Sequence, residues 1–332
     1  MSKRRLTKQQ QQRVSERRQA GMSSSQSTSD NLGDMGPELP GLVLSLFRNK
    51  ADIECEATGE IVRCHLRANL GAIVTGDRVQ WRRSENAAVV SAVFPRMSEL
   101  HRPDSFGKMK LVAANISQAI IVIAPFPEPH ANLIDRYLIA IKQLGIRARI
   151  VVNKSELRKT DDPGLQFLDL YPSLGYKVTE VSAHSGDKID ALKQLLAMET
   201  SIFVGQSGVG KSSLIQALLP DEELKIGELS EQANKGRHTT THARLYHFPF
   251  GGNCIDSPGI REFGLWHLSA EDIAAGFVEF QPFIDKCHFR DCKHQQEPGC
   301  SLIQAVKDGH ISPQRFNSFQ HIVASLDQVT VR

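Results

Sequence analysis

The sequence predicts a multidomain α/β protein built from a small β-barrel, a parallel α/β domain and a helical C-terminal domain. Three changes of pattern along the chain indicate this division. Short segments with alternating apolar and polar residues follow Gly41, and continuous apolar segments alternate with amphipathic helical ones from about Ala119. After about His267 the chain turns helical and gathers Cys and His. A length of 332 residues fits two or more units of about 150 residues each.

The composition excludes two broad classes of protein. With 40% hydrophobic and 23% charged residues, the chain as a whole is not disordered. The longest apolar run, residues 119–127, is far shorter than the roughly 20 residues that a bilayer span needs, so no membrane association is expected. Six cysteines without an apolar signal segment predict a reducing, cytoplasmic location, in which thiols stay free or bind a metal.

Residues 1–37 are expected to form a disordered basic arm. The first 20 residues hold seven Lys or Arg against the single acid Glu16, which leaves the rest of the chain with a net charge of −3. Residues 9–36 consist mainly of Gln, Ser, Gly and charged residues, which cannot bury a core. Contact with the phosphates of a nucleic acid is one interpretation of the arm. A solvated end without a partner and, ranked last, a mitochondrial transit peptide are the others.

Residues 38–102 are expected to form an RNA-binding barrel of the oligonucleotide-binding (OB) kind. Five strand candidates lie within about 55 residues, a count typical of that fold, at residues 42–47, 53–57, 62–66, 78–82 and 87–93. Arg63, His65 and Arg67 would share the outer face of the barrel. They form either a basic surface for nucleic acid or an ordinary solvated strand face.

Residues 103–266 are expected to form the α/β domain, after a linker at residues 101–107. Its apolar strand candidates lie at residues 119–124, 148–152, 177–181, 201–204, 244–248 and 253–255. A helical period of apolar residues runs through Leu133, Tyr137, Leu138, Ile141 and Leu144. Continuously apolar strands between amphipathic helices predict a parallel sheet that is covered on both faces.

A complete phosphate-binding loop follows the strand candidate at 201–204. Its sequence, Gly-Gln-Ser-Gly-Val-Gly-Lys-Ser at residues 205–212, leads into a helical stretch, as this motif requires. Backbone N–H groups and the helix N-terminus would hold phosphate oxygens. Lys211 would reach the β and γ phosphates, and the hydroxyl of Ser212 would ligate Mg²⁺. The expected nucleotide contacts here are Gly205, Gln206, Ser207, Gly208, Val209, Gly210, Lys211, Ser212 and Ser213.

Two further segments contain groups suited to a nucleoside triphosphate and its metal. Asp256 ends a strand candidate, where a partner of Mg²⁺ belongs, and Gly259 three residues later could turn its N–H to the γ-phosphate. Residues 236–241, Gly-Arg-His-Thr-Thr-Thr, could supply a threonine hydroxyl to the metal. Among the three adjacent threonines, Thr240 is favoured.

Two loops at strand ends could read a guanine base. Asn153 and Lys154 follow the strand candidate at 148–152, and Ser182 with Ala183 follows the one at 177–181. Glu156 would accept hydrogen bonds from the base, although the usual pattern has Asp there, so the extra methylene leaves guanine preference open. A single polar loop of this kind is common and need not bind a base. The two loops together, however, follow strands at the edge where open α/β sheets bind ligands.

The order of these motifs carries a family resemblance. Asn-Lys-x-acid and Ser-Ala precede the phosphate loop, whereas in Ras-like GTPases they follow it. Residues 38–320 resemble the RsgA/YjeQ family of circularly permuted GTPases, and residues 205–213, 236–241 and 256–263 match that family almost residue for residue. The resemblance implies a circularly permuted P-loop GTPase domain. It also implies hydrolysis of GTP to GDP, stimulated by the 30S ribosomal subunit, with 16S rRNA binding during late maturation of that subunit. A monomer is expected, although the sequence contains no direct indication of the oligomeric state.

Residues 267–332 are expected to form a helical zinc-binding domain. Three thiolates and one imidazole suit a tetrahedral Zn²⁺ without an open position, hence a structural ion, and they come from Cys287, Cys292, His294 and Cys300. The spacing C-x4-C-x-H-x5-C is also that of the family. Buried cysteines without a metal, or a disulfide, are the alternatives. Cys55, Cys64 and Cys254 lie among apolar strand residues and are expected in the core.

Catalysis would depend on neutralising the γ-phosphate and on orienting a water molecule. Lys211 and Mg²⁺ provide the neutralisation. Ile260 stands where Ras-like enzymes carry the glutamine that orients water, so His238 is the candidate for that task, and the resemblance also indicates it. The alternative interpretation of His238 is a histidine that takes no part in catalysis.

Two other functions remain open from the sequence. One is an RNA-binding adaptor that senses GTP or GDP without turnover, and the other is an ATP-using kinase or ATPase.

Overall fold

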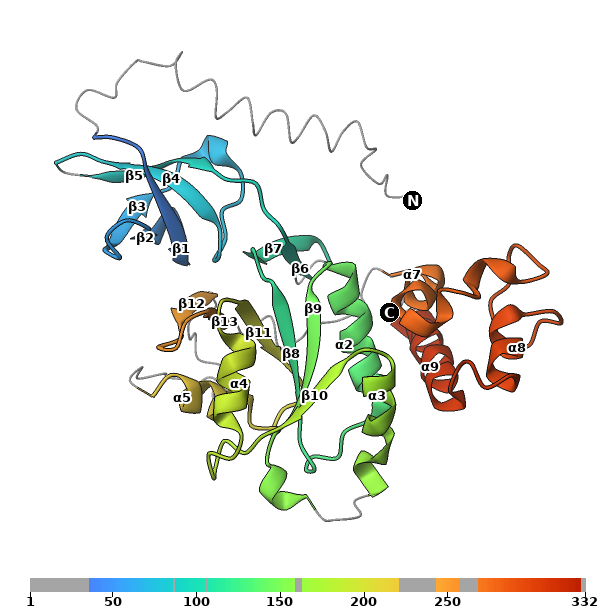
Figure 1. Cartoon of the computed structure of the whole chain (residues 1–332). Helices are drawn as coiled ribbons and strands as arrows, with labels where there is room; N and C mark the ends of the chain where they lie inside the picture. Colours follow the sequence, from blue (N-terminus) through green and yellow to red (C-terminus); the bar gives the residue numbers. More distant parts are fainter. Residues whose placement is uncertain are drawn as a thin grey trace.

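A computed structural model describes residues 36–85, 87–104, 107–158, 163–220, 243–256 and 268–329. Figure 1 shows three parts: a β-barrel, an α/β sheet with its helices, and a group of helices that ends the chain beside helix α2. Residues 1–35 of the basic arm expected at 1–37, and the threonine segment at 236–241, lie outside the described residues.

All five predicted barrel strands are present. They are β1 (Leu39–Phe47), β2 (Lys50–Cys55), β3 (Ile61–His65), β4 (Arg78–Arg83) and β5 (Ala88–Val93). The strands are ordered β1-β2-β3-β5-β4, and β1 also pairs with β4, which closes the barrel. Alternate side chains such as Val43, Ile53, Val79 and Trp81 fill its interior. Since the side-chain period of a strand is two, the alternation seen in the sequence becomes the inside and outside of the barrel.

The polar period of β3 gives the expected outer face. Arg63, His65 and Arg67 are all exposed. The guanidinium of Arg63 is paired with Asp52, with Nε 2.7 Å from the carboxylate, and lies 4.5 Å above the ring of Phe47. Cys55 and Cys64, by contrast, are buried in the barrel core, as predicted.

The α/β part is an open sheet covered on both faces, as predicted. Strands β10 (Lys177–Glu180), β9 (Arg147–Val152), β8 (Gln118–Ile123), β11 (Thr200–Val204) and β13 (Asn253–Asp256) run parallel in that order, and β12 (Arg244–His247) pairs antiparallel with β13. Alternate residues of β8 face opposite layers: Ile121 and Ile123 pack with helix α2 (Ala131–Gln143), whereas Ile120 and Val122 pack with α4 (Ile189–Leu196) and α5 (Lys211–Leu218).

The prediction of a linker at residues 101–107 is wrong. Strands β6 (Glu99–Pro103) and β7 (Met109–Ala114) form an antiparallel hairpin there. The side chain of Asp104 accepts a hydrogen bond from the N–H of Lys108, 2.9 Å away, across the turn. Pro103 is the last residue of β6, and Gly107 precedes β7. Proline and glycine are as typical of such a hairpin connection as of a linker.

The loop before β4, residues 74–77, anchors the barrel to the sheet and to the hairpin. The Thr75 hydroxyl donates to the carbonyl of Ala243, 2.9 Å away, at the start of β12. The next residue, Gly76, has φ +87°, and a Cβ there would lie 2.2 Å from the carbonyl oxygen of Ala114 in β7. A buried ion pair between Arg96 and Asp77, 2.6 Å apart, fixes the same loop. The barrel thus contacts the sheet through this loop, in which position 76 fits only glycine, and through the antiparallel pairing of β1 with β12.

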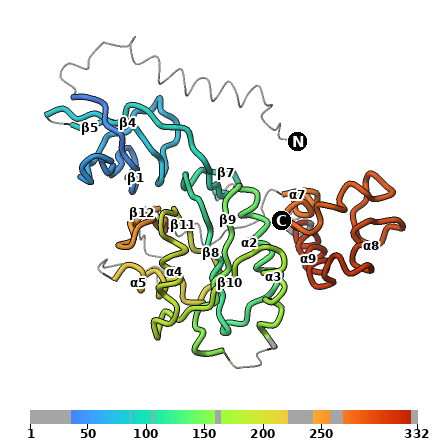
Figure 2. Tube along the Cα trace, in the orientation of Figure 1, coloured from blue at the N-terminus to red at the C-terminus, as the bar shows by residue number. Residues whose placement is uncertain are grey.

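The C-terminal part is helical, as predicted. It contains α7 (Ala270–Gly276), short 3₁₀ turns at Val278–Phe280 and Ile284–Lys286, α8 (Ser301–Lys307) and α9 (Pro313–Val329). Its core is rich in aromatic rings, and Phe277, Phe280 and Phe319 are fully buried. Figures 1 and 2 show α2 between the sheet and these helices. No helix within the described ranges is long and apolar enough to span a membrane.

We predict that Gly76→Ala lowers the melting temperature much more than Gly71→Ala. Both glycines have positive φ, but a Cβ at position 71 would meet nothing within 4 Å. The left-handed backbone costs a substituted alanine about 1–2 kcal/mol at either site, and the clash with Ala114 should add about 1–3 kcal/mol. Thermal unfolding of the two variants measures the difference, and equal melting temperatures would contradict the tight barrel anchor.

Candidate nucleotide site and candidate metal centre

The predicted phosphate loop connects β11 to α5, as its motif requires. The φ values of Gly205, Gly208 and Gly210 are +144°, +83° and +87°. Residues other than glycine adopt such backbone conformations only with strain. A Cβ on Gly205 would lie 2.1 Å from the carbonyl oxygen of Val122 in β8. Helix α5 begins at Lys211, so its free N–H groups face the loop. The geometry is that of an anion-binding site.

The side chain of Asn153 joins three of the predicted segments. This residue follows β9 and is only 1% exposed. Its Nδ2 donates to the carbonyl of Val209, 2.9 Å away in the phosphate loop, and its Oδ1 accepts from the N–H of Ala183 at 3.1 Å. A Cβ on Gly210 would lie 2.3 Å from the same Nδ2. Loops that are distant in the chain therefore meet at one buried amide.

Two lysines lie along the phosphate loop. Lys154 has a left-handed backbone with φ +59°, and its Nζ donates to the carbonyl oxygens of Gly208 at 2.7 Å and Phe126 at 3.1 Å. The Nζ of Lys211 donates to the carbonyls of Gly205, 2.7 Å away, and Gln206. Positive charge thus gathers where phosphate oxygens would bind.

Glu156 and Ser182 also meet. A hydrogen bond from the Ser182 side chain lowers the pKa of the exposed Glu156 carboxyl. Ser182 itself is buried at the end of β10, and its hydroxyl accepts from the N–H of Ser185 at 2.9 Å. The acid that the sequence predicts as a base reader is therefore an ionised acceptor beside the Asn153 loop.

The remaining predicted nucleotide residues divide into two groups. Ser212 and Ser213 lie in the first turn of α5, and Asp256 ends β13, which pairs with β11 beside the loop. His238, Thr240 and Gly259 lie outside the described residues. The structure thus brings together the expected loop, the Asn153 segment and the Ser182 segment, with Asp256 on the neighbouring strand.

The four predicted metal ligands converge in the C-terminal part. The ligand atoms of Cys287, Cys292, His294 and Cys300 all lie within 4.8 Å of one another. His294 Nδ1 is 3.5 Å from the sulfur of Cys287 and 3.4 Å from that of Cys300. Burial lowers the pKa of His294, which favours the neutral ring that a metal binds. All six cysteines of the chain lie among the described residues and are free, so the disulfide alternative is wrong.

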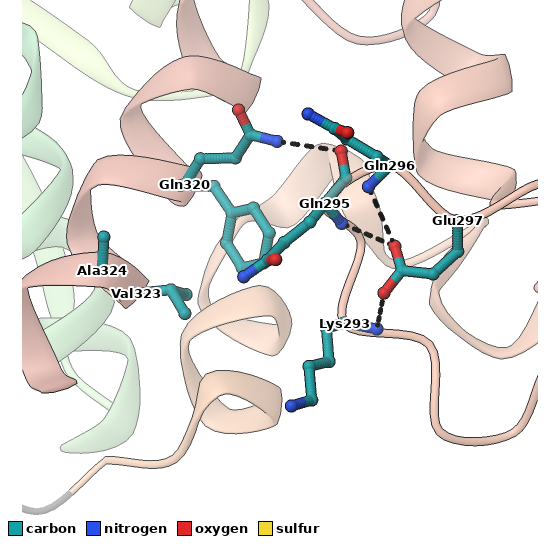
Figure 3. A pocket seen from close by; sticks show the side chains of 8 residues that line it. Lys293, Gln295, Gln296, Glu297, Gln320, Val323 and Ala324 are labelled. Atoms are coloured by element: carbon teal, nitrogen blue, oxygen red, sulfur yellow. Dashed lines mark hydrogen bonds between the residues drawn. The ribbon is translucent and has the colours of Figure 1, made fainter.

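Sequence reasoning missed a carboxylate that supports this cluster. Figure 3 shows Glu297 accepting hydrogen bonds from the backbone N–H groups of Lys293, Gln295 and Gln296, at 2.8, 2.8 and 3.1 Å. Gln320 on α9 donates to the carbonyl of Gln295 at 3.4 Å. Glu297 therefore fixes the backbone on both sides of His294. Its position between two ligands could have drawn attention to it, but the spacing alone does not reveal which amides it binds.

Comparison with known proteins assigns the family. A model of the RsgA GTPase family matches residues 93–266. The "Small ribosomal subunit biogenesis GTPase RsgA" of Pseudomonas syringae pv. syringae (strain B728a) is 54% identical over 302 residues, which cover 89% of this chain and 88% of that protein. The chain belongs to the RsgA GTPase family. The namesake protein of Pseudomonas putida (strain F1) is 53% identical over 300 residues, with the same two shares of 89% and 88%.

Solved structures support the same assignment for the fold. "YjeQ from Thermotoga maritima" matches with a TM-score of 0.72 and 31% identity, over 87% of this chain and 99% of that one. "YloQ, a circularly permuted GTPase" matches the fold with a TM-score of 0.69 and 24% identity, over 92% of this chain and 100% of that one. This RsgA-family chain is therefore a GTP-hydrolysing enzyme with a circularly permuted GTPase domain, as predicted.

We predict that Asn153→Ala weakens GTP binding at least about tenfold. The substitution removes the hydrogen bonds that hold two loops together, and it leaves the buried carbonyl of Val209 without its donor. Binding of a fluorescent GTP analogue measures the effect. Asn49→Ala, in an exposed turn of the barrel, serves as the control and should bind normally. An unchanged affinity in the Asn153 variant would contradict the bridging role.

Proposed function

We propose that this protein hydrolyses GTP to GDP on the 30S ribosomal subunit during late maturation of that subunit, in the cytoplasm and as a monomer. The observation that carries the proposal is the junction at Asn153, which joins the phosphate loop to the Ser182-Ala183 loop. This junction supports the proposal that one site holds both the triphosphate and the base, because it brings the two predicted loops together. Relatives that carry the name of a small ribosomal subunit biogenesis GTPase share 54% of its residues over most of its length, which supports the ribosomal part.

Each motif has a role in this proposal. The guanine base is held by Asn153, Lys154, Glu156, Ser182 and Ala183. Phosphate oxygens accept hydrogen bonds from the loop Gly205, Gln206, Ser207, Gly208, Val209 and Gly210, followed by Lys211, Ser212 and Ser213. Gly259 donates its N–H to the γ-phosphate. The left-handed glycines of the loop support this assignment, because they let the backbone approach an anion closely.

Hydrolysis needs a metal ion and an oriented water molecule. Mg²⁺, bound with GTP, would neutralise the negative charge that spreads over the phosphoryl oxygens. The hydroxyls of Ser212 and Thr240 would ligate it, with Asp256 as a further partner. Ser212 lies in the first turn of α5, and Asp256 is the last residue of β13. Lys211 reaches the β and γ phosphates, and His238 orients the attacking water.

The barrel and the basic arm are the proposed contacts with 16S rRNA. Arg63 and His65 are exposed on β3, and Arg67, two residues after that strand, is exposed as well. Arg63 stacks on Phe47, whose ring is 40% exposed, so a cation and an aromatic surface lie side by side there. Bases and phosphates of RNA are bound by groups of these two kinds.

The Cys287, Cys292, His294 and Cys300 cluster is proposed to hold one structural Zn²⁺ ion. Three sulfurs and one imidazole nitrogen form the tetrahedral donor set that zinc prefers, and no fifth protein group or open position is needed. The ion would connect the loop after the turn Ile284–Lys286 to the start of α8.

We predict that His238→Ala lowers the 30S-stimulated kcat at least about 100-fold. This is the usual range for loss of a group that orients or activates water. The affinity for GTP should stay within about twofold of the wild type. Single-turnover hydrolysis with and without 30S subunits measures both the rate and the stimulation. His321→Ala, at an exposed position of α9, is the matched control. An unchanged stimulated rate in the His238 variant rejects the assignment, and no hydrolysis by the wild type would favour the adaptor function.

We predict that in Ser182→Ala the loss of GTP affinity on acidification occurs at a higher pH than in the wild type. The Ser182 hydrogen bond lowers the pKa of Glu156, so the carboxylate stays ionised, and accepts from guanine, until the pH falls through this lowered pKa. Without the hydroxyl the pKa rises towards its ordinary value, and affinity is lost earlier as the pH falls. A pH series of GTP affinity checks this, with circular dichroism at each pH to confirm that the variant is folded.

Glu156→Gln is the reference for this experiment. It cannot ionise, so its affinity should be lower and should show no step in the same pH range. A wild-type titration curve that coincides with that of the Ser182 variant would contradict the effect of the Ser182 hydrogen bond on Glu156. A step that persists in Glu156→Gln would count against the proposed base contact.

We predict that Glu297→Gln releases zinc faster, with an affinity about 10-fold lower or more, the usual effect of losing a group that orients a metal ligand. Zinc transfer to a chromogenic chelator measures it. Asp291→Asn removes the same charge from an exposed position of the same loop and should release zinc at the wild-type rate. If both variants release zinc equally faster than the wild type, the negative charge, rather than the hydrogen bonds of Glu297, determines zinc retention.

A further inference from the structure

We propose that Phe126 is a substrate-binding residue of the GTPase site and that its ring packs against the guanosine part of the nucleotide. The inference deepens the proposed function, because it rests on the nucleotide site formed by the Asn153 loop and the phosphate loop. It adds an aromatic side chain to a site in which none of the predicted base contacts is aromatic.

Strand β8 lies in the sheet between the two strands that lead into these loops. It pairs in parallel with β9 on one side and with β11 on the other (Figure 1). Its last residue, Ile123, is paired with Val152, the last residue of β9. Val204, the last residue of β11, is paired with Ile121. The segment after β8 therefore leaves the sheet between the Asn153 loop and the phosphate loop, at the edge where open α/β sheets bind ligands.

The backbone of this segment contacts both loops. The carbonyl oxygen of Phe126 accepts a hydrogen bond from Nζ of Lys154, 3.1 Å away, and the same Nζ donates to the carbonyl of Gly208 at 2.7 Å. A Cβ on Gly208 would lie 3.5 Å from Cδ of Pro127. One ammonium group therefore fixes Phe126 beside the phosphate loop and beside the loop that is proposed to hold the base.

The sequence also limits the freedom of this segment. Residues 125–129 read Pro-Phe-Pro-Glu-Pro, and each proline ring fixes its own φ angle. A residue that precedes a proline is kept out of the helical region as well, which applies to Phe126 and Glu128. Pro129 is buried, and α2 begins two residues later at Ala131. A segment with so few accessible conformations loses little entropy when it binds a ligand.

The ring of Phe126 is largely exposed in spite of this restricted backbone. Its exposed fraction of 73% is the highest of any phenylalanine that the structure describes. Ile123 and Ala124, which come shortly before it in the chain, are fully buried. Covering an exposed aromatic ring with a ligand is favourable, because apolar surface leaves water. The nucleotide site thus has an apolar surface at the exit of its central strand.

The guanosine part of the nucleotide matches this surface. Ribose connects the base to the phosphates, so it lies between the base loops and the phosphate loop, where the segment after β8 leaves the sheet. Aromatic side chains stack on nucleobases because every base has a π-face, whereas phosphates bind N–H groups and cations. Phe126 therefore contributes equally to the affinities for GTP and GDP, which share the nucleoside, and contributes nothing to the binding of inorganic triphosphate.

Nucleotide affinity of the full chain, without ribosomal subunits, tests the inference. Phe126→Ala should bind a non-hydrolysable GTP analogue and GDP about 5-fold more weakly or worse, and by the same factor for both, because a large apolar side chain no longer covers the nucleoside. Phe126→Leu keeps an apolar side chain and should recover part of the affinity.

Met198→Ala is the matched control. Met198 is 92% exposed and precedes β11, so it lies at the opposite end of that strand from the phosphate loop. Its variant also loses a large exposed apolar side chain, but it should bind both nucleotides with the affinity of the wild type. A weakening as large as that of Phe126→Ala would show a general effect of surface truncation and overturn the inference.

Phe126→Trp reports on the contact directly. The emission of the added indole should change when GDP binds and stay constant with inorganic triphosphate, after subtraction of the signal of the wild type with its two tryptophans. An added signal that does not respond to GDP would overturn the contact.

Asn153→Ala, measured in the same assay, separates this inference from the proposed function. Weakened binding by Asn153→Ala with unchanged affinity in Phe126→Ala would overturn the contact at Phe126 and leave the proposed site in place. Unchanged affinity in both variants would overturn the site as well. A Phe126→Ala variant that binds nucleotide normally but has lost affinity for 30S subunits would assign the ring to the ribosome and overturn the nucleoside contact.

Discussion

The nucleotide site depends on one buried amide, that of Asn153. Its oxygen and nitrogen bind the backbone of two loops that belong to different strand ends. A side-chain amide has both a donor and an acceptor on one rigid plane, so it can join two backbones at once, and leaving either partner unpaired in a buried position would cost about 1–3 kcal/mol. The Asn153 and Ser182 segments precede the phosphate loop in the chain, yet all three meet because the parallel strands that carry them end at the same sheet edge.

Fixed contacts also connect the parts of the molecule. The barrel reaches the sheet at Ala243 and near Ile255, one at the start of β12 and the other in β13. The C-terminal helices reach it through α2, with the buried cluster around Arg315. Each contact combines close packing with a buried polar group that has one suitable partner. Such contacts specify a single arrangement, whereas apolar packing alone would allow the parts to slide.

The metal cluster shows how a loop of little regular structure is given a defined shape. Its four ligands come from a segment that contains short turns only, until α8 begins after Cys300. Glu297 satisfies three backbone N–H groups of that loop, and Gln320 connects it to α9. The ligand types decide which metal the loop suits, and these surrounding hydrogen bonds fix where the ligands point.

The sequence by itself determined the strands, the phosphate loop, the metal ligands and the family, because alternation, glycine spacing and motif order are local properties of the chain. Tertiary structure decided which loops meet at Asn153, that residues 99–114 form a hairpin instead of a linker, and that Arg315 pairs with Asp135. The junction at Asn153 and the pair of Arg315 with Asp135 depend on contacts between residues far apart in the chain. The hairpin pairs residues close in the chain, but the proline and glycine at its turn are equally typical of a linker. A local pattern shows that Arg315 is polar on a helix, but only packing shows that it is buried and what it binds.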